Sequence, residues 1–166
     1  MGLFSFVKNA GAKLFGHKEE KPAVTVASTP TAPVYSQEEL NAAMAQRLRS
    51  ELDDYGFATD TLAVSVKEDI VSVAGTLPSQ SDKEKAILVL GNVSGVAFVD
   101  DQISVDSPEP ESQFHTVVSG DTLGKISKHY YGDAGKYTAI FEANKPMLSH
   151  PDKIYVGQVL RIPALA

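Results

Sequence analysis

The sequence predicts an α+β protein made of two small domains, and three observations support this fold class. Apolar residues recur every three or four positions in some segments and alternate with polar residues in others, which is typical of helices and strands packed together. Two proline-containing stretches, 18–34 and 107–113, divide the chain. The length of 166 residues suits two small domains, and an apolar share of 43% is enough to build their cores.

Composition excludes several classes of function. The net charge of -6 argues against a nucleic-acid-binding protein, because phosphate contacts need clustered Lys and Arg. The same acidic balance is compatible with a cation as ligand. The chain has no cysteine, so disulfides and thiolate metal sites are excluded.

Residues 1–17 are expected to form a short N-terminal helical segment that docks on the first domain. Most of their apolar residues lie three or four positions apart and share one helical face, although Gly11 interrupts the pattern. The apolar run that begins at Leu3 follows no basic region and is too short for a secretory signal or a membrane span. We therefore expect a cytoplasmic protein without stable membrane insertion. Residues 18–34 are expected to be a flexible linker.

The first domain is expected at residues 35–106. Ser36 begins a helix with a capping box, and Gly56 ends it. Two segments of alternating polarity follow, 62–66 and 70–77, and both are typical of half-buried strands.

A second helix and a third strand complete this domain. Residues 78–81 cap a helix that runs from Asp82 to Leu90 and has acidic residues in its first turn. Gly91 stands where a C-terminal glycine belongs. Residues 96–105 alternate again and predict a strand, so the order of elements is αββαβ.

The second domain is expected at residues 114–166, after a short linker. Residues 115–118 predict a strand, and the turn at 119–122 supplies the cap of a helix that Gly132 ends. A further short helix follows. Residues 159–162 predict the last strand, so this unit is βααβ.

The second domain resembles the LysM domain over its whole length, and is called the LysM-like unit below. LysM domains have a βααβ fold and commonly bind N-acetylglucosamine polymers such as peptidoglycan. The residues that carry the resemblance are Thr116-Val117, Gly120-Asp121-Thr122-Leu123, Ile126-Ser127, Tyr130-Tyr131-Gly132, Ile140, Ala143-Asn144, Ile154, Gly157-Gln158 and Leu160-Arg161-Ile162-Pro163. The glycan-binding residues that it implies are Gly120, Asp121, Thr122, Asn144 and Ile154.

The first domain resembles the BON domain, and is called the BON-like unit below. BON domains are αββαβ modules associated with membranes, lipids or osmotic stress. The resemblance rests on Val71-Ser72-Val73-Ala74-Gly75, and on Gly95-Val96 with Val99-Asp100-Asp101 after a helix.

The combination of the two units is similar to the family of cytoplasmic bacterial potassium-binding proteins. It joins an N-terminal MGLFSFVK, a BON-like unit with GNVSGV at 91–96, and a LysM-like unit with NKPML at 144–148. The linker at 18–34 departs from that family, whose connection is shorter, and leaves open how the N-terminal segment reaches the BON-like unit. The resemblance implies a monomeric potassium sensor that becomes more compact and acts in ion or osmotic stress.

The stretch 91–96 has the chemistry of a potassium cage. A helix C-terminus presents unpaired carbonyls and a partial negative charge, and glycine lets several carbonyls point the same way. Backbone carbonyls replace the water shell of potassium, whereas carboxylates favour harder ions. One loop supplies too few oxygens, and residues 7–12 are a second source. The resemblance implies as ligands the carbonyls of Val7, Ala10, Ala12, Gly91, Val93 and Val96.

Other interpretations stay open. Gly91 and Gly95 also fit an ordinary helix cap and turn, and the glycan-binding residues also fit caps and ends of helices. A second hypothesis is a peptidoglycan-binding adaptor with the BON-like unit as a spacer, and a third is a lipid-surface protein. The LysM-like unit is alternatively expected to pack on the BON-like unit, respond to ion occupancy and contact a protein partner.

We expect no enzyme. His115, His129 and His150 lack the tight spacing of a zinc site, and the chain has no recognisable nucleophile motif or Gly-rich phosphate loop. Asp100 and Asp101 are interpreted as a solvated strand start or as a source of negative potential near the cage, with a divalent-ion site as the alternative.

Overall fold

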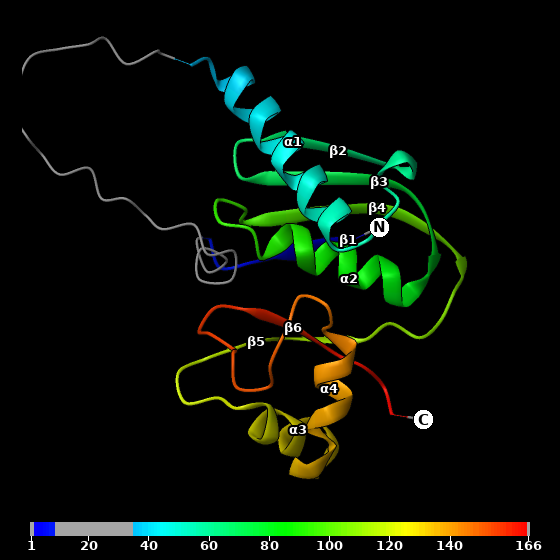
Figure 1. The fold of residues 1–166 in the computed structure, drawn as a ribbon, viewed down its shortest axis with the longest axis vertical. Helices are drawn as coiled ribbons and strands as arrows, with labels where there is room; N and C mark the ends of the chain where they lie inside the picture. The colour runs from blue at the N-terminus through cyan, green and yellow to red at the C-terminus, as the bar shows by residue number, and fades with distance from the viewer. Residues whose placement is uncertain (1, 9–34, 166) are drawn as a thin grey trace, which may run out of the picture.

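The structure is a computed structural model that describes residues 2–8 and 35–165 (Figure 1). It confirms the α+β fold class, with an αββαβ unit before a βααβ unit. The elements in chain order are β1 (Gly2–Ser5), α1 (Gln37–Asp54), the 3-10 helix η2 (Thr59–Thr61), β2 (Leu62–Lys67), β3 (Ile70–Ser79), α2 (Gln80–Gly91), β4 (Phe98–Ser107), β5 (Gln113–Thr116), α3 (Leu123–Tyr131), the 3-10 helix η3 (Ala134–Lys136), α4 (Tyr137–Ala143) and β6 (Val159–Ile162). None of the helices in these two ranges has the length and apolar character needed to cross a membrane.

Strand β1 shows that the helical prediction is wrong for the start of the chain. It pairs antiparallel with β4, with Phe4 opposite Val99. Leu3 is 66% exposed, whereas Phe4 packs against the core, so burial alternates as in a strand. The apolar residues at the start of the chain fit either period, and the edge of β4 favours the strand because it pairs with the backbone N–H and C=O groups. Residues 9–17 of the predicted helical segment and the whole predicted linker lie outside the described residues.

The three strands of the BON-like unit and β1 form a four-stranded sheet, in the order β1-β4-β3-β2, that two helices cover on one face (Figure 1). Strands β2 and β3 form an antiparallel hairpin, and α2 connects β3 to its parallel neighbour β4. The helices and the inward strand positions form one core, made of Leu48, Leu52, Leu62, Val64, Val71, Val73, Leu77, Ala86, Ile87, Val89, Leu90, Val93, Val96, Val99 and Ile103. The loop between α2 and β4 contributes two of these side chains and is therefore anchored in the core.

The LysM-like unit is a two-stranded antiparallel sheet with two short helices. Strands β5 and β6 pair with Phe114 opposite Arg161. Thr122 caps α3 by accepting a hydrogen bond from the Lys125 backbone N–H at 3.2 Å, and Gly132 ends that helix with a left-handed φ of 74°. The core of this unit consists of Val117, Leu123, Ile126, Ile140, Leu148, Leu160 and Ile162.

Helix α2 forms the boundary between the two units, and Figure 1 shows the LysM-like unit beside it. Three buried residues of this helix and the residue that caps it lie four positions apart on one side. They are called the α2 stripe: Gln80, Glu84, Leu88 and the cap Asn92. Leu88 forms a separate small core with Met147 and Val159 of the LysM-like unit. The α2 stripe therefore packs outward from the BON-like core, against the second unit.

Glu84 is the charged centre of this boundary. Its carboxylate accepts hydrogen bonds from Gln80 Nε2 at 3.0 Å and from the Ser112 backbone N–H at 2.8 Å, and it pairs with Arg161. Burial alone would raise the pKa of the Glu84 carboxyl, but these hydrogen bonds outweigh burial and hold the pKa below its ordinary value. The folded protein therefore favours the ionised form.

Acid is expected to weaken the contact between the units through Glu84. A carboxyl whose pKa is lowered by folding adds stability above its unfolded pKa, which is about 4.3, and this stability is lost as pH falls through the folded value. We predict that Glu84→Gln lowers stability at neutral pH by about 3 kcal/mol and flattens the loss of stability in acid. Melting temperatures of both proteins across the acidic range test this, and equal acid sensitivity would contradict it.

Candidate ion-binding site

The end of α2 differs in one respect from the prediction that Gly91 is a C-terminal cap. Gly91 is the last helical residue, and Asn92 is the cap, with φ of -83° and ψ of -2°. Glycine is needed at position 91 for a different reason. A Cβ there would overlap the ring of Phe6, which follows β1. A tertiary contact therefore requires glycine at this position.

The turn in the backbone comes at Gly95. Its φ is +99°, a left-handed value that favours glycine, and a Cβ there would lie 3.0 Å from Met44 Cε. Val93 and Val96 on either side are each 1% exposed, and the Val96 N–H donates to the Val93 carbonyl at 3.2 Å. The buried valines therefore hold a sharp turn that has no charged side chain.

The start of the chain lies against this loop. The Phe6 N–H donates to the Ala97 carbonyl at 2.7 Å, which extends the antiparallel pairing of β1 by one residue and places Val7 on the side of Val96. Next to it, Lys8 Nζ forms an ion pair with Asp69 Oδ2 at 3.2 Å. The structure thus places Phe6, the neighbour of Val7 in the chain, against Gly91 and Ala97. The predicted ligands Ala10 and Ala12 lie outside the described residues.

The prediction that Asp101 is part of a solvated strand start is wrong. Asp101 lies on the covered face of the sheet and is 2% exposed. Its carboxylate pairs with Lys83 Nζ at 2.8 Å and accepts a hydrogen bond from the Ile103 N–H at 2.9 Å. Asp100 lies on the other face and accepts a hydrogen bond from Gln102 at 2.8 Å. Within the described ranges, no group of three or more His, Asp or Glu side chains converges to hold a metal.

The glycan residues implied by the LysM resemblance fall into two groups. Gly120 occupies an exposed turn with φ of +88°. Asp121 accepts hydrogen bonds from the Val118 N–H at 3.0 Å and from His115 Nε2 at 2.9 Å, which together lower the pKa of its carboxyl. Together with the cap Thr122, they form one exposed turn at the start of α3.

The other two glycan residues lie inside the unit. Asn144 is 1% exposed, and its amide bonds the Ile140 carbonyl and both backbone groups of Arg161. Ile154 packs against the core. This geometry gives Asn144 a structural role, because its polar atoms are already in use.

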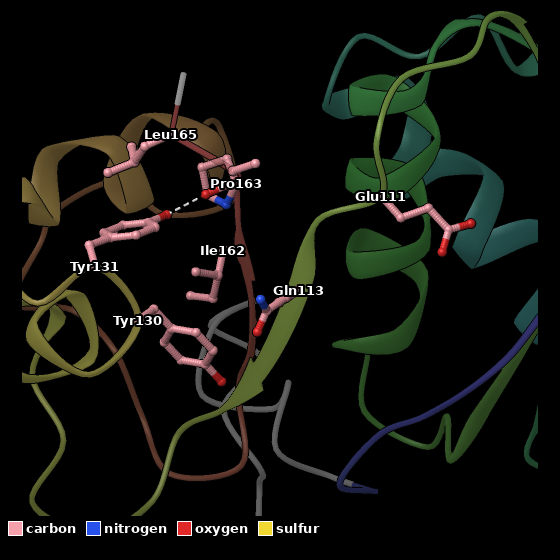
Figure 2. A pocket seen from close by; sticks show the side chains of 8 residues that line it. Glu111, Gln113, Tyr130, Tyr131, Ile162, Pro163 and Leu165 are labelled. Carbon is pink, nitrogen blue, oxygen red and sulfur yellow. Dashed lines mark hydrogen bonds between the residues drawn. The ribbon is translucent and has the colours of Figure 1, made fainter.

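A separate pocket of about 370 Å³ lies at the other end of the LysM-like unit, between α3 and the end of β6 (Figure 2). Tyr130 and Tyr131 line it, and the Tyr131 hydroxyl donates to the Pro163 carbonyl at 2.6 Å. Figure 2 shows the Glu111 carboxylate pointing away from these rings. None of the residues predicted for glycan or ion binding lines this pocket.

Three residues that organise the site were not predicted from the sequence: Phe6, Glu84 and Asn92. The sequence does not mark Glu84 or Asn92, because Glu84 lies among the charged residues 82–85 and Asn92 lies in an uncharged stretch with two glycines. Phe6 lies next to the predicted ligand Val7 in the sequence, but no sequence pattern identifies Gly91 as the residue that its ring contacts.

Comparisons with known proteins agree with this architecture. Family profiles match the BON domain at residues 41–107 and the LysM domain at residues 115–163. The chain is 45% identical over 168 residues to an Escherichia coli O6:H1 protein named "Potassium binding protein Kbp", covering 98% of this chain and 99% of that protein. It is 32% identical over 117 residues to a Deinococcus radiodurans protein named "Uncharacterized protein", covering 64% of this chain and 46% of that protein.

The fold and these matches define a two-domain protein in which a BON domain precedes a LysM domain. The chain belongs to the same family as the Escherichia coli Potassium binding protein Kbp. The BON-like and LysM-like units are therefore a BON domain and a LysM domain.

The contact between Phe6 and Gly91 leads to a prediction. We expect Gly91→Ala to destabilise the protein by about 1–3 kcal/mol, because the added methyl group forces the Phe6 ring out of its place. Gly124→Ala is the matched control, since Gly124 also lies in a helix and its nearest neighbours would be 3.9 Å from a new Cβ. That change is expected to stabilise the protein by about 0.5–1 kcal/mol.

Urea unfolding followed by circular dichroism measures both effects. Phe6→Ala, introduced together with Gly91→Ala, is expected to show strong coupling in a double-mutant cycle. A Gly91→Ala protein as stable as the Gly124→Ala protein would show that the Phe6 ring does not exclude a side chain at position 91.

Proposed function

We propose that this protein binds potassium through backbone carbonyls at the end of α2 and senses the ion in the cytoplasm as a monomer. The proposed ligands are the carbonyls of Val7, Ala10, Ala12, Gly91, Val93 and Val96. The observation that carries the proposal is the 45% identity, over nearly the full length, to a protein named for potassium binding.

The chemistry of the loop supports the proposal. The stretch 91–96 contains no charged side chain, so the oxygens that it offers an ion are mainly backbone carbonyls. Carbonyl dipoles suit a large, weakly hydrated ion such as potassium, whereas carboxylate cages suit calcium or magnesium. Sodium is expected to bind more weakly, because it needs a smaller cage and more dehydration.

The sensing part of the proposal is that ion binding makes the protein more compact. The N-terminal segment and the LysM domain both contact the end of α2, through Phe6 and through Val159. An ion that holds the loop in one conformation favours both contacts, because a ligand stabilises the state that binds it. We connect this change to ion or osmotic stress.

Calorimetric titration of desalted protein tests potassium binding. Potassium chloride is expected to give a saturable signal, and sodium chloride at equal ionic strength little or none, with choline as the balancing cation. At a potassium concentration about a hundredfold above Kd, the protein should gain about 2.7 kcal/mol of stability. No heat from potassium and no change in melting temperature would refute the proposal.

A pair of glycine variants distinguishes an effect specific to the loop from the general effect of backbone strain. Gly95→Ala places a side chain at a left-handed φ of +99° in the loop, and Gly132→Ala does so at +74° at the end of α3. Both are expected to lose stability, but only Gly95→Ala is expected to weaken potassium binding, by about tenfold or more. Equal potassium affinities in the two variants would argue against the loop as the potassium-binding site.

A second candidate function is peptidoglycan binding by the LysM domain. The observation that favours it is an exposed apolar pair, Val118 and Val156, each 57% exposed. The two lie on adjoining turns, because the Gly157 N–H donates to the Val117 carbonyl at 2.8 Å. Retention on insoluble peptidoglycan that Val118→Asp removes would support this function, and no retention would exclude it.

A further inference from the structure

Asn92 links the proposed ion loop directly to the LysM domain. It follows Gly91 and precedes Val93, and its side chain is almost fully buried, at 2% exposed. Asn92 Oδ1 accepts from the Val159 N–H at 3.0 Å, and Nδ2 donates to the Val159 carbonyl at 3.1 Å. Nδ2 also lies 3.5 Å from Met147 Sδ. These partners all belong to the LysM domain.

The two hydrogen bonds satisfy the backbone N–H and C=O of Val159 in β6, as a neighbouring strand would. Two residues further on, the backbone N–H and C=O of Arg161 are bonded in the same way by the Asn144 amide, at 2.8 Å each. One amide comes from the LysM domain itself and the other from the BON domain. The loop between α2 and β4 therefore supplies part of the pairing of a LysM strand.

We propose that Asn92 is a positioning residue that fixes the carbonyls of the stretch 91–96 and couples ion occupancy to the docking of the LysM domain. This inference rests on the proposed potassium function. The backbone of Asn92 lies between two proposed ligands, Gly91 and Val93, while its side chain is held by Val159. A movement of β6 therefore displaces the loop. By thermodynamic reciprocity, an ion that orders the loop also strengthens the contact with β6.

The test is Asn92→Ala in the full chain, with Glu84→Gln as the matched control. Both changes remove buried polar contacts between α2 and the LysM domain, but Glu84 lies two turns before the ion loop. Potassium affinity is measured by calorimetry, compactness by small-angle X-ray scattering with and without potassium, and folding by circular dichroism.

Asn92→Ala is expected to raise the potassium Kd by about fivefold or more and to abolish the change in compactness. Glu84→Gln is expected to lower the melting temperature while changing Kd by less than about twofold. Asn92→Ser, whose hydroxyl is too short to bond both atoms of Val159, is expected to behave like Asn92→Ala and serves if the alanine protein does not fold.

Three results decide between the proposals. A folded Asn92→Ala or Asn92→Ser protein with the wild-type Kd would overturn the role of Asn92 and leave the potassium function intact. Equal losses of affinity in the Asn92 and Glu84 variants would also overturn it, because any loosening of the domains would then suffice. A wild-type protein that binds no potassium would refute the proposed function itself.

Discussion

The contact between the Phe6 ring and the backbone of Gly91 is the constraint on which the arrangement around the end of α2 depends. The ring leaves no room for a side chain at position 91, and the Phe6 N–H also bonds the Ala97 carbonyl. One residue therefore contacts the loop between α2 and β4 at both of its ends. As a result, the start of the chain, the end of a helix and the start of a strand meet where the proposed carbonyl ligands lie.

Helix α2 is buried on two sides, which determines how the domains meet. Its inner face packs in the BON core through residues such as Ile87 and Leu90, and the α2 stripe faces the LysM domain. Buried polar groups need partners, and Glu84 and Asn92 find them in Arg161 and in the backbone of Val159. Directional bonds therefore fix the orientation of the LysM domain, in addition to the apolar contact.

The order of elements was predictable because it depends on local chemistry. The capping box at Ser36 and the left-handed glycine that ends α3 act within a few residues of themselves. The errors occur where tertiary contacts decide. A few apolar residues at the N-terminus fit a helix or a strand until the edge of β4 is known, and the role of Gly91 depends on Phe6. The partner of Asn92 lies 67 residues away, which no local pattern identifies.

Carbonyl-carbon NMR shifts during a potassium titration test the central claim most directly. A carbonyl that coordinates a cation is polarised by it, so we predict the largest shifts at the six proposed ligands and small shifts when sodium replaces potassium. These ligands are Val7, Ala10, Ala12, Gly91, Val93 and Val96. Shifts concentrated on carboxylates such as Asp100, or confined to the exposed LysM turn at Gly120, would contradict the claim that backbone carbonyls at the end of α2 hold the ion.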